Sequence, residues 1–144
     1  MTDARPPLPL PEIAAYAAPY WAAASEHRLV LQHCLHCDRI QHFPRPFCIR
    51  CLGDDLDFVA ASGLGTVYTF TVVRRHPDPV FAARLPYVIA LVDLDDGVRI
   101  HTNLVGCPPD TVRVGQRVEV CFEDVDDTHA IPLFTPVRDD REDA

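Results

Sequence analysis

Hydrophobic and polar residues alternate along the second half of the chain in a way that predicts β-strands, because successive side chains of a strand point to opposite faces. The alternating runs are rich in β-branched and aromatic residues, which favour strands. They span residues 65–75, 87–94, 98–105, 117–124 and 131–137. Asp95, Asp96 and Gly97 form a hairpin-turn signal between the second and third runs. Five strands with no helical pattern between them predict a small closed or nearly closed barrel, and we expect an OB-fold.

The first third of the chain has a helical pattern followed by a strand pattern. Residues 1–10 are rich in proline and are expected to form an extended arm. A helix is predicted from Glu12, because a proline in the first turn and an acidic residue near the positive end of the helix dipole both favour a helix start. Pro19 interrupts this helix and begins a second one. Short strands are then predicted at residues 28–34 and 39–44, as in a zinc ribbon.

These patterns divide the chain into four segments and predict a mainly β protein. The segments are an N-terminal arm with helices at 1–27, a zinc ribbon at 28–55, a five-stranded OB-fold barrel at 56–138 and a charged, disordered tail at 139–144. A chain of 144 residues, 48% of them hydrophobic, is long enough to bury a core of its own.

Two C-x-x-C pairs are the strongest chemical signal in the sequence. They supply Cys34, Cys37, Cys48 and Cys51. Zinc in a structural site prefers four soft ligands in a tetrahedron, and two such pairs provide four thiolates from tight turns. We therefore expect a structural zinc ion, since four cysteines close the coordination sphere and leave no position for a catalytic water. A rubredoxin-like iron centre, a redox dithiol and a site without metal remain as alternatives.

Apart from this cluster, no set of residues forms a recognisable catalytic pattern. His33, His36 and His42 lie beside the cysteines and could replace one as a ligand, but solvent-facing positions on short strands explain them more simply. Cys121 falls in an alternating strand, as a small core residue would. Cys107 lacks a histidine and carboxylate pattern that would make it a nucleophile. The sequence therefore favours a protein that is not an enzyme by itself.

The net charge of −8 argues against nucleic acid as a partner, since an acidic surface repels polyanions. No run of about 18 apolar residues is present, and the N-terminus lacks the layout of a signal peptide. We therefore expect a cytoplasmic protein that does not enter a membrane. In that reducing compartment, paired C-x-x-C motifs are interpreted as metal ligands before disulfides.

Several segments taken together resemble the DUF35 family. They are the aromatic segment PYWAAASEH, the cysteine spacing, the FPRP link between the two pairs and the strand GTVYTFTV. The resemblance extends from about Tyr16 to Val137. It implies an N-terminal rubredoxin-like zinc ribbon followed by an OB-fold, in a protein related to acyl-CoA metabolism.

The resemblance also implies a function that depends on a partner. Family members associate with thiolase-like proteins, including lipid-transfer-protein-type aldolases that cleave steroid side chains, and with acyltransferases; others are joined to MaoC-like hydratases. In the thiolase-type assemblies the catalytic residues belong to the partner, and the OB-fold module helps shape the acyl-CoA site. We accordingly expect a non-catalytic accessory subunit of a hetero-oligomer. The alternatives are an independent acyl-CoA-binding or lipid-binding module and, by fold analogy alone, a protein that binds single-stranded nucleic acid.

Two small sets of residues are candidates for contact with CoA and with the partner. CoA phosphates need local positive charge. The candidates for it are Arg45, Arg50, Arg74 and Arg75, with surface solubility as the competing interpretation. The candidates for a partner interface are Tyr20, Trp21 and Phe81, because aromatic side chains lose little conformational entropy when an interface buries them. Packing against the ribbon is the competing explanation for Trp21.

Overall fold

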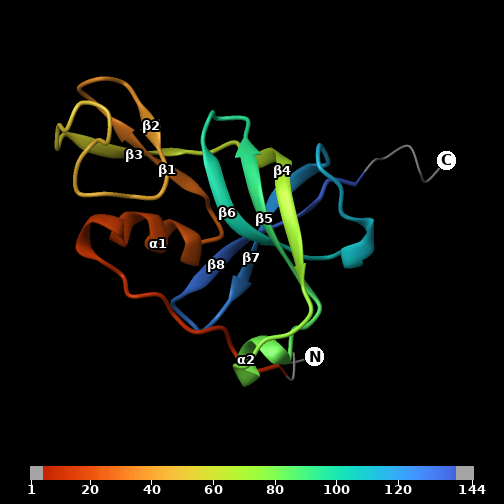
Figure 1. Ribbon diagram of the computed structural model, residues 1–144. Coiled ribbons are helices and arrows are strands. Elements are labelled where there is room, and N and C mark those ends of the chain that lie inside the picture. Colours follow the sequence, from red (N-terminus) through yellow and green to blue (C-terminus); the bar gives the residue numbers. More distant parts are fainter. Residues whose placement is uncertain (1–4, 139–144) are drawn as a thin grey trace.

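The computed structural model describes residues 5–138 and consists of a short N-terminal helix, a three-stranded sheet and a five-stranded closed barrel (Figure 1). The sheet and the cysteine-bearing loops form a ribbon at one end of the molecule, and the barrel occupies the other (Figure 1). The predicted architecture, a ribbon followed by an OB-fold-like barrel, is confirmed. The expected disorder of the tail at 139–144 concerns residues outside the described range.

The N-terminal helix begins later than the sequence predicts. A single 3-10 turn, η1, spans Ala15–Ala17, and α1 (Ala18–Ser25) follows it. The predicted helix start at Glu12 is wrong, because the residues around it stay exposed or half-buried and a short helix needs tertiary packing to be stable. Pro19 lies in the first turn of α1, as expected, where its missing N–H costs no hydrogen bond.

The ribbon sheet has the strand order β2-β1-β3. Its strands are β1 (Val30–Cys34), β2 (Ile40–Gln41) and β3 (Leu56–Ala60). In the antiparallel pair of β1 with β3, Val30 lies opposite Ala60 and Cys34 lies opposite Leu56. The sequence did not predict β3, since this segment follows an aspartate-rich turn and lacks regular alternation. Its strand conformation comes from pairing with β1.

Two buried glutamines hold the loop between the cysteine pairs from the inside. Gln32 and Gln41 are each 2% exposed, and the Gln41 amide donates to Gln32 Oε1 at 2.6 Å. Gln32 also donates to the carbonyl of Arg45 and accepts from its N–H, both at 2.9 Å. Gln41 donates to the Phe47 carbonyl at 3.2 Å and accepts from the Ile49 N–H at 3.0 Å. These backbone groups of the loop therefore form their hydrogen bonds with buried glutamine side chains, while the side chains of Arg45, Phe47 and Ile49 stay exposed.

The barrel strands follow the order β4-β5-β6-β8-β7, and β4 pairs with β7 to close the barrel. They are β4 (Leu64–Val73), β5 (Tyr87–Leu94), β6 (Arg99–Leu104), β7 (Arg117–Asp124) and β8 (Ala130–Pro136). All pairs are antiparallel except β6 with β8, which pair in parallel at Leu104 and Phe134. The predicted turn joins β5 to β6, and Gly97 there adopts a φ of 91°, which favours glycine.

One hydrophobic core continues from the ribbon into the barrel. Leu29 and Leu31, at the start of the ribbon, belong to the same buried cluster as Val92, Val118 and Phe134 of the barrel. The three barrel residues are fully buried, and Leu31 is 1% exposed. Because β1 contributes to this shared core, the ribbon and the barrel pack against each other directly.

The connection between β4 and β5 contains a helical turn that the sequence analysis missed. α2 (Pro79–Ala82) begins after Asp78, whose carboxylate accepts a hydrogen bond from the Val80 N–H at 2.8 Å. A further 3-10 turn, η2 (Pro109–Thr111), follows β6. None of the helices among residues 5–138 has the length and apolar character needed to cross a bilayer.

Candidate functional site

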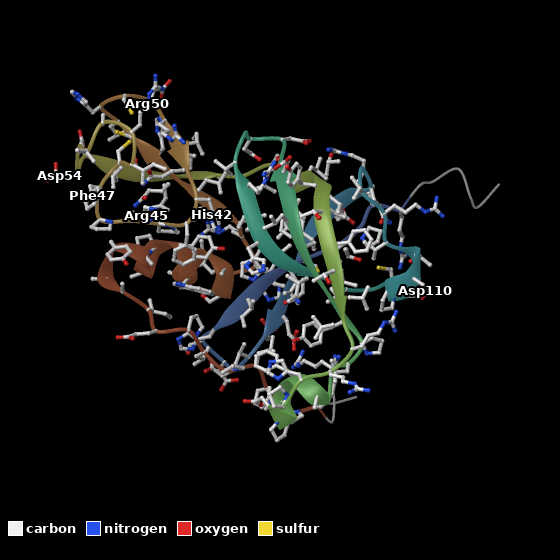
Figure 2. The ribbon with its side chains drawn as sticks, in the orientation of Figure 1. His42, Arg45, Phe47, Arg50, Asp54 and Asp110 are labelled. Carbon is white, nitrogen blue, oxygen red and sulfur yellow. The ribbon has the colours of Figure 1, made fainter. Side chains whose placement is uncertain are left out.

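The four cysteines of the C-x-x-C pairs come together in the ribbon (Figure 2). Their sulfur atoms all lie within 4.8 Å of one another. The closest contacts join different pairs: Cys34 to Cys51 and Cys37 to Cys48, each with 3.6 Å between the Sγ atoms. Four sulfurs placed about 2.3 Å from a zinc ion in a tetrahedron would be about 3.8 Å apart. The cluster therefore has the size of a tetrahedral zinc site.

The two cysteine turns share one local geometry. The Asp38 N–H donates to the Cys34 carbonyl, and the Leu52 N–H donates to the Cys48 carbonyl, both at 2.9 Å. Asp38 and Leu52 have positive φ angles of 65° and 62°, in a region that few leucines occupy. This repeated turn directs the sulfurs of both pairs toward the same point.

Backbone N–H groups support the sulfurs of the second pair. The Arg50 N–H donates to Cys48 Sγ and the Gly53 N–H to Cys51 Sγ, each at 3.4 Å. Hydrogen bonds of this kind stabilise a thiolate. The backbone amides of Cys51 and Arg50 lower the pKa of the Cys48 thiol to about 6. At Cys51, the backbone hydrogen bond from Gly53 is outweighed by burial and the neighbouring thiols, which raise the pKa to about 11. A cation among the four sulfurs would favour the thiolate form of all of them, because the thiolate is the form that binds a metal.

The residues present fit a structural zinc ion held by the four cysteines. Within residues 5–138, no histidine or carboxylate joins them in a possible metal site. His33 pairs instead with Asp38, through Nε2 and Oδ1, and His36 is exposed, as expected. The expectation of a solvent-facing position is wrong for His42, which is partly buried among aromatic rings. Sulfur ligands alone do not separate zinc from iron.

An aromatic cluster joins α1 to the ribbon. The Tyr20 ring lies 5.2 Å from that of Trp21, 5.6 Å from His42 and 5.5 Å from Phe43, between centroids. Tyr20 is only 4% exposed, and burial raises the pKa of its phenol. Trp21 is half-buried and packs against the Phe43 ring at 6.4 Å. Tyr20 and Trp21 thus contact ribbon side chains, and their proposed place at a partner interface stays a prediction. Phe43, at 42%, is the exposed member of the cluster.

The four arginines proposed for CoA are all exposed, and they lie in separate parts of the molecule. In Figure 2, Arg45 lies on the side of the ribbon next to α1, whereas Arg50 lies at the upper end of the ribbon. Arg74 and Arg75 follow the end of β4 on the barrel. The structure does not bring the four together, and their role stays a prediction.

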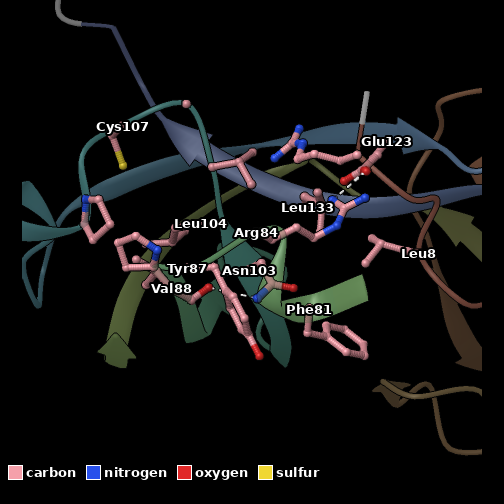
Figure 3. A pocket seen from close by; sticks show the side chains of 15 residues that line it. Leu8, Phe81, Arg84, Tyr87, Val88, Asn103, Leu104, Cys107, Glu123 and Leu133 are labelled. Atoms are coloured by element: carbon pink, nitrogen blue, oxygen red, sulfur yellow. Dashed lines mark hydrogen bonds and ion pairs between the residues drawn. The ribbon is translucent and has the colours of Figure 1, made fainter. Parts of the chain in front are cut away.

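Phe81 lines a cavity of about 240 Å³ at the end of the barrel beside α2 (Figure 3). Its ring lies 4.7 Å from that of His76 and 6.4 Å from that of Tyr87. Other residues of the lining are Leu8, Arg84, Val88, Asn103, Leu104 and Cys107. Phe81 is therefore half-buried in a cavity wall, and its proposed contact with a partner stays a prediction.

Arg84 is one of the charged groups that line this cavity, and the sequence analysis missed it. Its Nη1 lies 2.8 Å from Glu123 Oε1, and its Nη2 donates to the Pro6 carbonyl at 3.1 Å. Its Nε is buried and has no hydrogen-bond partner among the described residues. No local pattern could have indicated this site, because the N-terminal arm, the β4–β5 connection and β7 meet only in the folded barrel.

Two family models match this chain in sequence. The rubredoxin-like zinc ribbon domain of ChsH2 matches residues 21–57. The C-terminal OB-fold domain of ChsH2 matches residues 58–123. Together the two matches include the four cysteines and most of the barrel.

Two curated relatives and one solved structure are similar over most of this chain. A probable enoyl-CoA hydratase alpha subunit from Thermomonospora curvata is 40% identical over 89% of the chain, which spans only 40% of that relative. A DUF35 domain-containing scaffold protein from Methanocaldococcus jannaschii is 36% identical, over 69% of this chain and 73% of its own length. A chain in the structure of the Ltp2-ChsH2(DUF35) aldolase is 39% identical, with a TM-score of 0.80 over 88% of this chain and 98% of its own.

Replacing Cys34 with serine should remove the metal and destabilise the protein, because metal-ligand free energy contributes directly to folding. We expect the zinc content, measured by inductively coupled plasma mass spectrometry, to fall from one ion per chain to near zero. The free energy of unfolding should fall by at least about 3 kcal/mol. Cys107→Ser is the matched control and should keep its zinc. Iron in the wild-type protein, or full zinc in Cys34→Ser, would contradict this assignment.

Replacing His42 with phenylalanine should reduce the loss of stability in acid. Burial lowers the pKa of His42 to about 4 from its ordinary 6.5, so the unfolded chain binds more protons between these values. The stability from neutral His42 is present above pH 6.5 and declines as the pH falls toward 4. The measurement is the free energy of unfolding in urea at pH 7 and at pH 5. Its decrease between the two pH values should be smaller in His42→Phe than in wild type, by up to about 2 kcal/mol. His101→Phe, at an exposed position, should behave as wild type.

Proposed function

Since this chain belongs to the DUF35 family, we propose that it is an accessory module of a thiolase-like aldolase or acyltransferase. It binds and stabilises that enzyme and helps form its acyl-CoA site. The carbon–carbon bond chemistry takes place in the partner, and the degradation of steroid side chains is one setting for it. The proposal rests chiefly on the similarity to a chain in the structure of the Ltp2-ChsH2(DUF35) aldolase, which covers 88% of this chain and 98% of that one.

The chemistry of the cysteines supports a role outside catalysis. Four thiolates leave a bound zinc ion no open position for water or substrate. Burial raises the pKa of the Cys107 thiol and of the Cys121 thiol, which keeps both protonated and weakens them as nucleophiles. The partner would therefore supply the nucleophile and the general base, and this chain would supply shape and binding surface.

The barrel supports a contribution to the acyl-CoA site. Arg74 and Arg75 precede His76, whose ring contacts Phe81 in the wall of the barrel-end cavity. Among the described residues, neither arginine side chain forms an ion pair, so both are available for the phosphates of CoA. A cytoplasmic location, where acyl-CoA is made and used, is part of the proposal.

An independent acyl-CoA-binding or lipid-binding module is the second candidate, and the cavity itself is the observation that favours it. The cavity is partly lined by apolar side chains such as Leu8 and Leu104. Its volume of about 240 Å³ lies below the usual range for drug-sized ligands, about 300–1,000 Å³. We therefore expect the chain alone to bind acyl-CoA weakly.

Co-expression with the thiolase-like protein encoded nearest to this chain in its genome should yield a stable hetero-oligomer. Size-exclusion chromatography with light scattering would detect it, and the partner's activity should depend on the presence of this chain. Isothermal titration calorimetry should show tighter binding of acetyl-CoA to the complex than to the chain alone. Equal binding by the chain alone, with no complex, would favour the independent binding module.

Replacing both Arg74 and Arg75 with alanine should weaken the use of acyl-CoA by the complex. Contacts to the CoA phosphates act equally in the ground state and the transition state, so KM should rise with little change in kcat. We expect an increase of roughly tenfold for the pair, measured by initial rates. Arg113→Ala, also exposed on the barrel, is the matched control. An unchanged KM would remove these two arginines from the acyl-CoA site.

A further inference from the structure

We propose that the loop between the two cysteine pairs is the surface by which this chain docks onto its thiolase-like partner. We call residues 43–49, which run from this loop into the second cysteine turn and expose the side chains of Phe43, Arg45, Phe47 and Ile49, the docking loop. The inference rests on the proposed function and specifies which part of the chain the partner contacts. It assigns to the partner an apolar recess edged by carboxylate side chains.

Exposed large hydrophobic side chains are concentrated in the docking loop and in the cysteine turns beside it. Phe43, Phe47 and Ile49 are 42%, 46% and 46% exposed, and Leu35 and Leu52 in the neighbouring cysteine turns are 53% and 72% exposed. Elsewhere among the described residues, exposed large hydrophobic side chains are spread over a much longer stretch of chain. A concentration of this kind marks a surface that another molecule covers.

The loop is held in place before any partner binds. The hydrogen bonds from Gln32 and Gln41 fix its backbone at Arg45, Phe47 and Ile49. The Phe43 ring, at the start of the loop, rests 5.5 Å from the buried ring of Tyr20. The exposed side chains therefore project from a backbone that is already ordered. Binding through such a surface loses little conformational entropy, which favours affinity.

The charge of the ribbon indicates an acidic partner surface. Residues 39–53 contain three arginines and no acidic residue. The segment 28–55 has four arginines and three aspartates, a net charge of +1, so the remainder of this −8 chain carries −9. The loop is thus basic and apolar within an otherwise acidic protein. A partner surface with both carboxylates and an apolar recess complements it.

Arg45 is the charged side chain best placed for this contact. Both of its backbone polar groups bond to Gln32, while its side chain is exposed and forms no ion pair among the described residues. Figure 2 shows Arg45 and Phe47 near the side of the ribbon that faces α1. A guanidinium can pair with a carboxylate through two parallel hydrogen bonds, and arginine and aromatic residues are the types that dominate interface energies.

The test uses the complex of the full-length chain with the thiolase-like protein encoded nearest to it. The variants are Phe47→Asp and Arg45→Glu, and the matched controls are Val114→Asp and Arg113→Glu. The controls lie in the loop after η2, near Asp110, at the opposite end of the molecule from the ribbon (Figure 2). Zinc content and circular dichroism should be unchanged in all four, since each replaced residue is at an exposed position.

We expect Phe47→Asp and Arg45→Glu each to raise the dissociation constant for the partner by roughly 30-fold or more. The controls should stay within about threefold of wild type, by calorimetry without CoA. Hydrogen exchange should slow at residues 43–49 when the complex forms. If the wild-type chain binds its partner and both docking variants bind equally well, the docking assignment is wrong and the proposed function stands. If the wild-type chain forms no complex, the docking assignment and the proposed function are both wrong.

Three further results would assign the loop to a different occupant and overturn the proposal. If the chain alone self-associates and Phe47→Asp abolishes this self-association, the occupant of the loop is a second copy of this chain. If the isolated chain binds CoA, and Arg45→Glu abolishes this binding but leaves partner binding intact, the occupant of the loop is CoA. Salt-dependent binding of a single-stranded oligonucleotide that is lost in both variants would identify nucleic acid.

Discussion

Four sulfur atoms within 4.8 Å of one another are the constraint on which the ribbon depends. The ribbon sheet contains only three strands, and β2 has just two residues, so hydrogen bonding and burial alone supply little stability there. The cysteine turns close the open end of this sheet and bring the second pair back beside the first. With a metal bound, the free energy of coordination would contribute to folding.

The ribbon in turn organises the two surfaces around it. Gln32 leaves the central strand β1 to hold the loop between the cysteine pairs, and the aromatic ring of Tyr20 packs against the other end of that loop. On its barrel side, β1 contributes Leu31 to the common core. The metal site is thus connected, through β1 and the aromatic cluster, to the loop, to α1 and to the core that the ribbon shares with the barrel.

This arrangement separates the tasks that the proposed function requires. The ribbon carries a basic, apolar loop on an ordered backbone, which suits contact with another protein. The barrel carries a cavity at one end, with Arg84 and Glu123 paired at its wall, which suits a small part of a ligand. The proposed function places the catalytic groups in the partner, and it is consistent with the two thiols outside the cysteine cluster, those of Cys107 and Cys121, whose pKa burial raises.

The sequence by itself determined those features that depend on spacing along the chain. The C-x-x-C pairs specified the four cysteines whose sulfurs cluster, and the alternation of residues specified the barrel strands and the turn at Gly97. Features that depend on distant segments were decided only by the tertiary structure. The strand β3 forms because β1 is beside it, Tyr20 is buried because the ribbon covers α1, and Arg84 meets Glu123 and Pro6 only in the closed barrel. The docking loop belongs to the second class: its residues are adjacent in sequence, but two glutamines from the neighbouring strands decide which of its atoms face inward and which face the solvent.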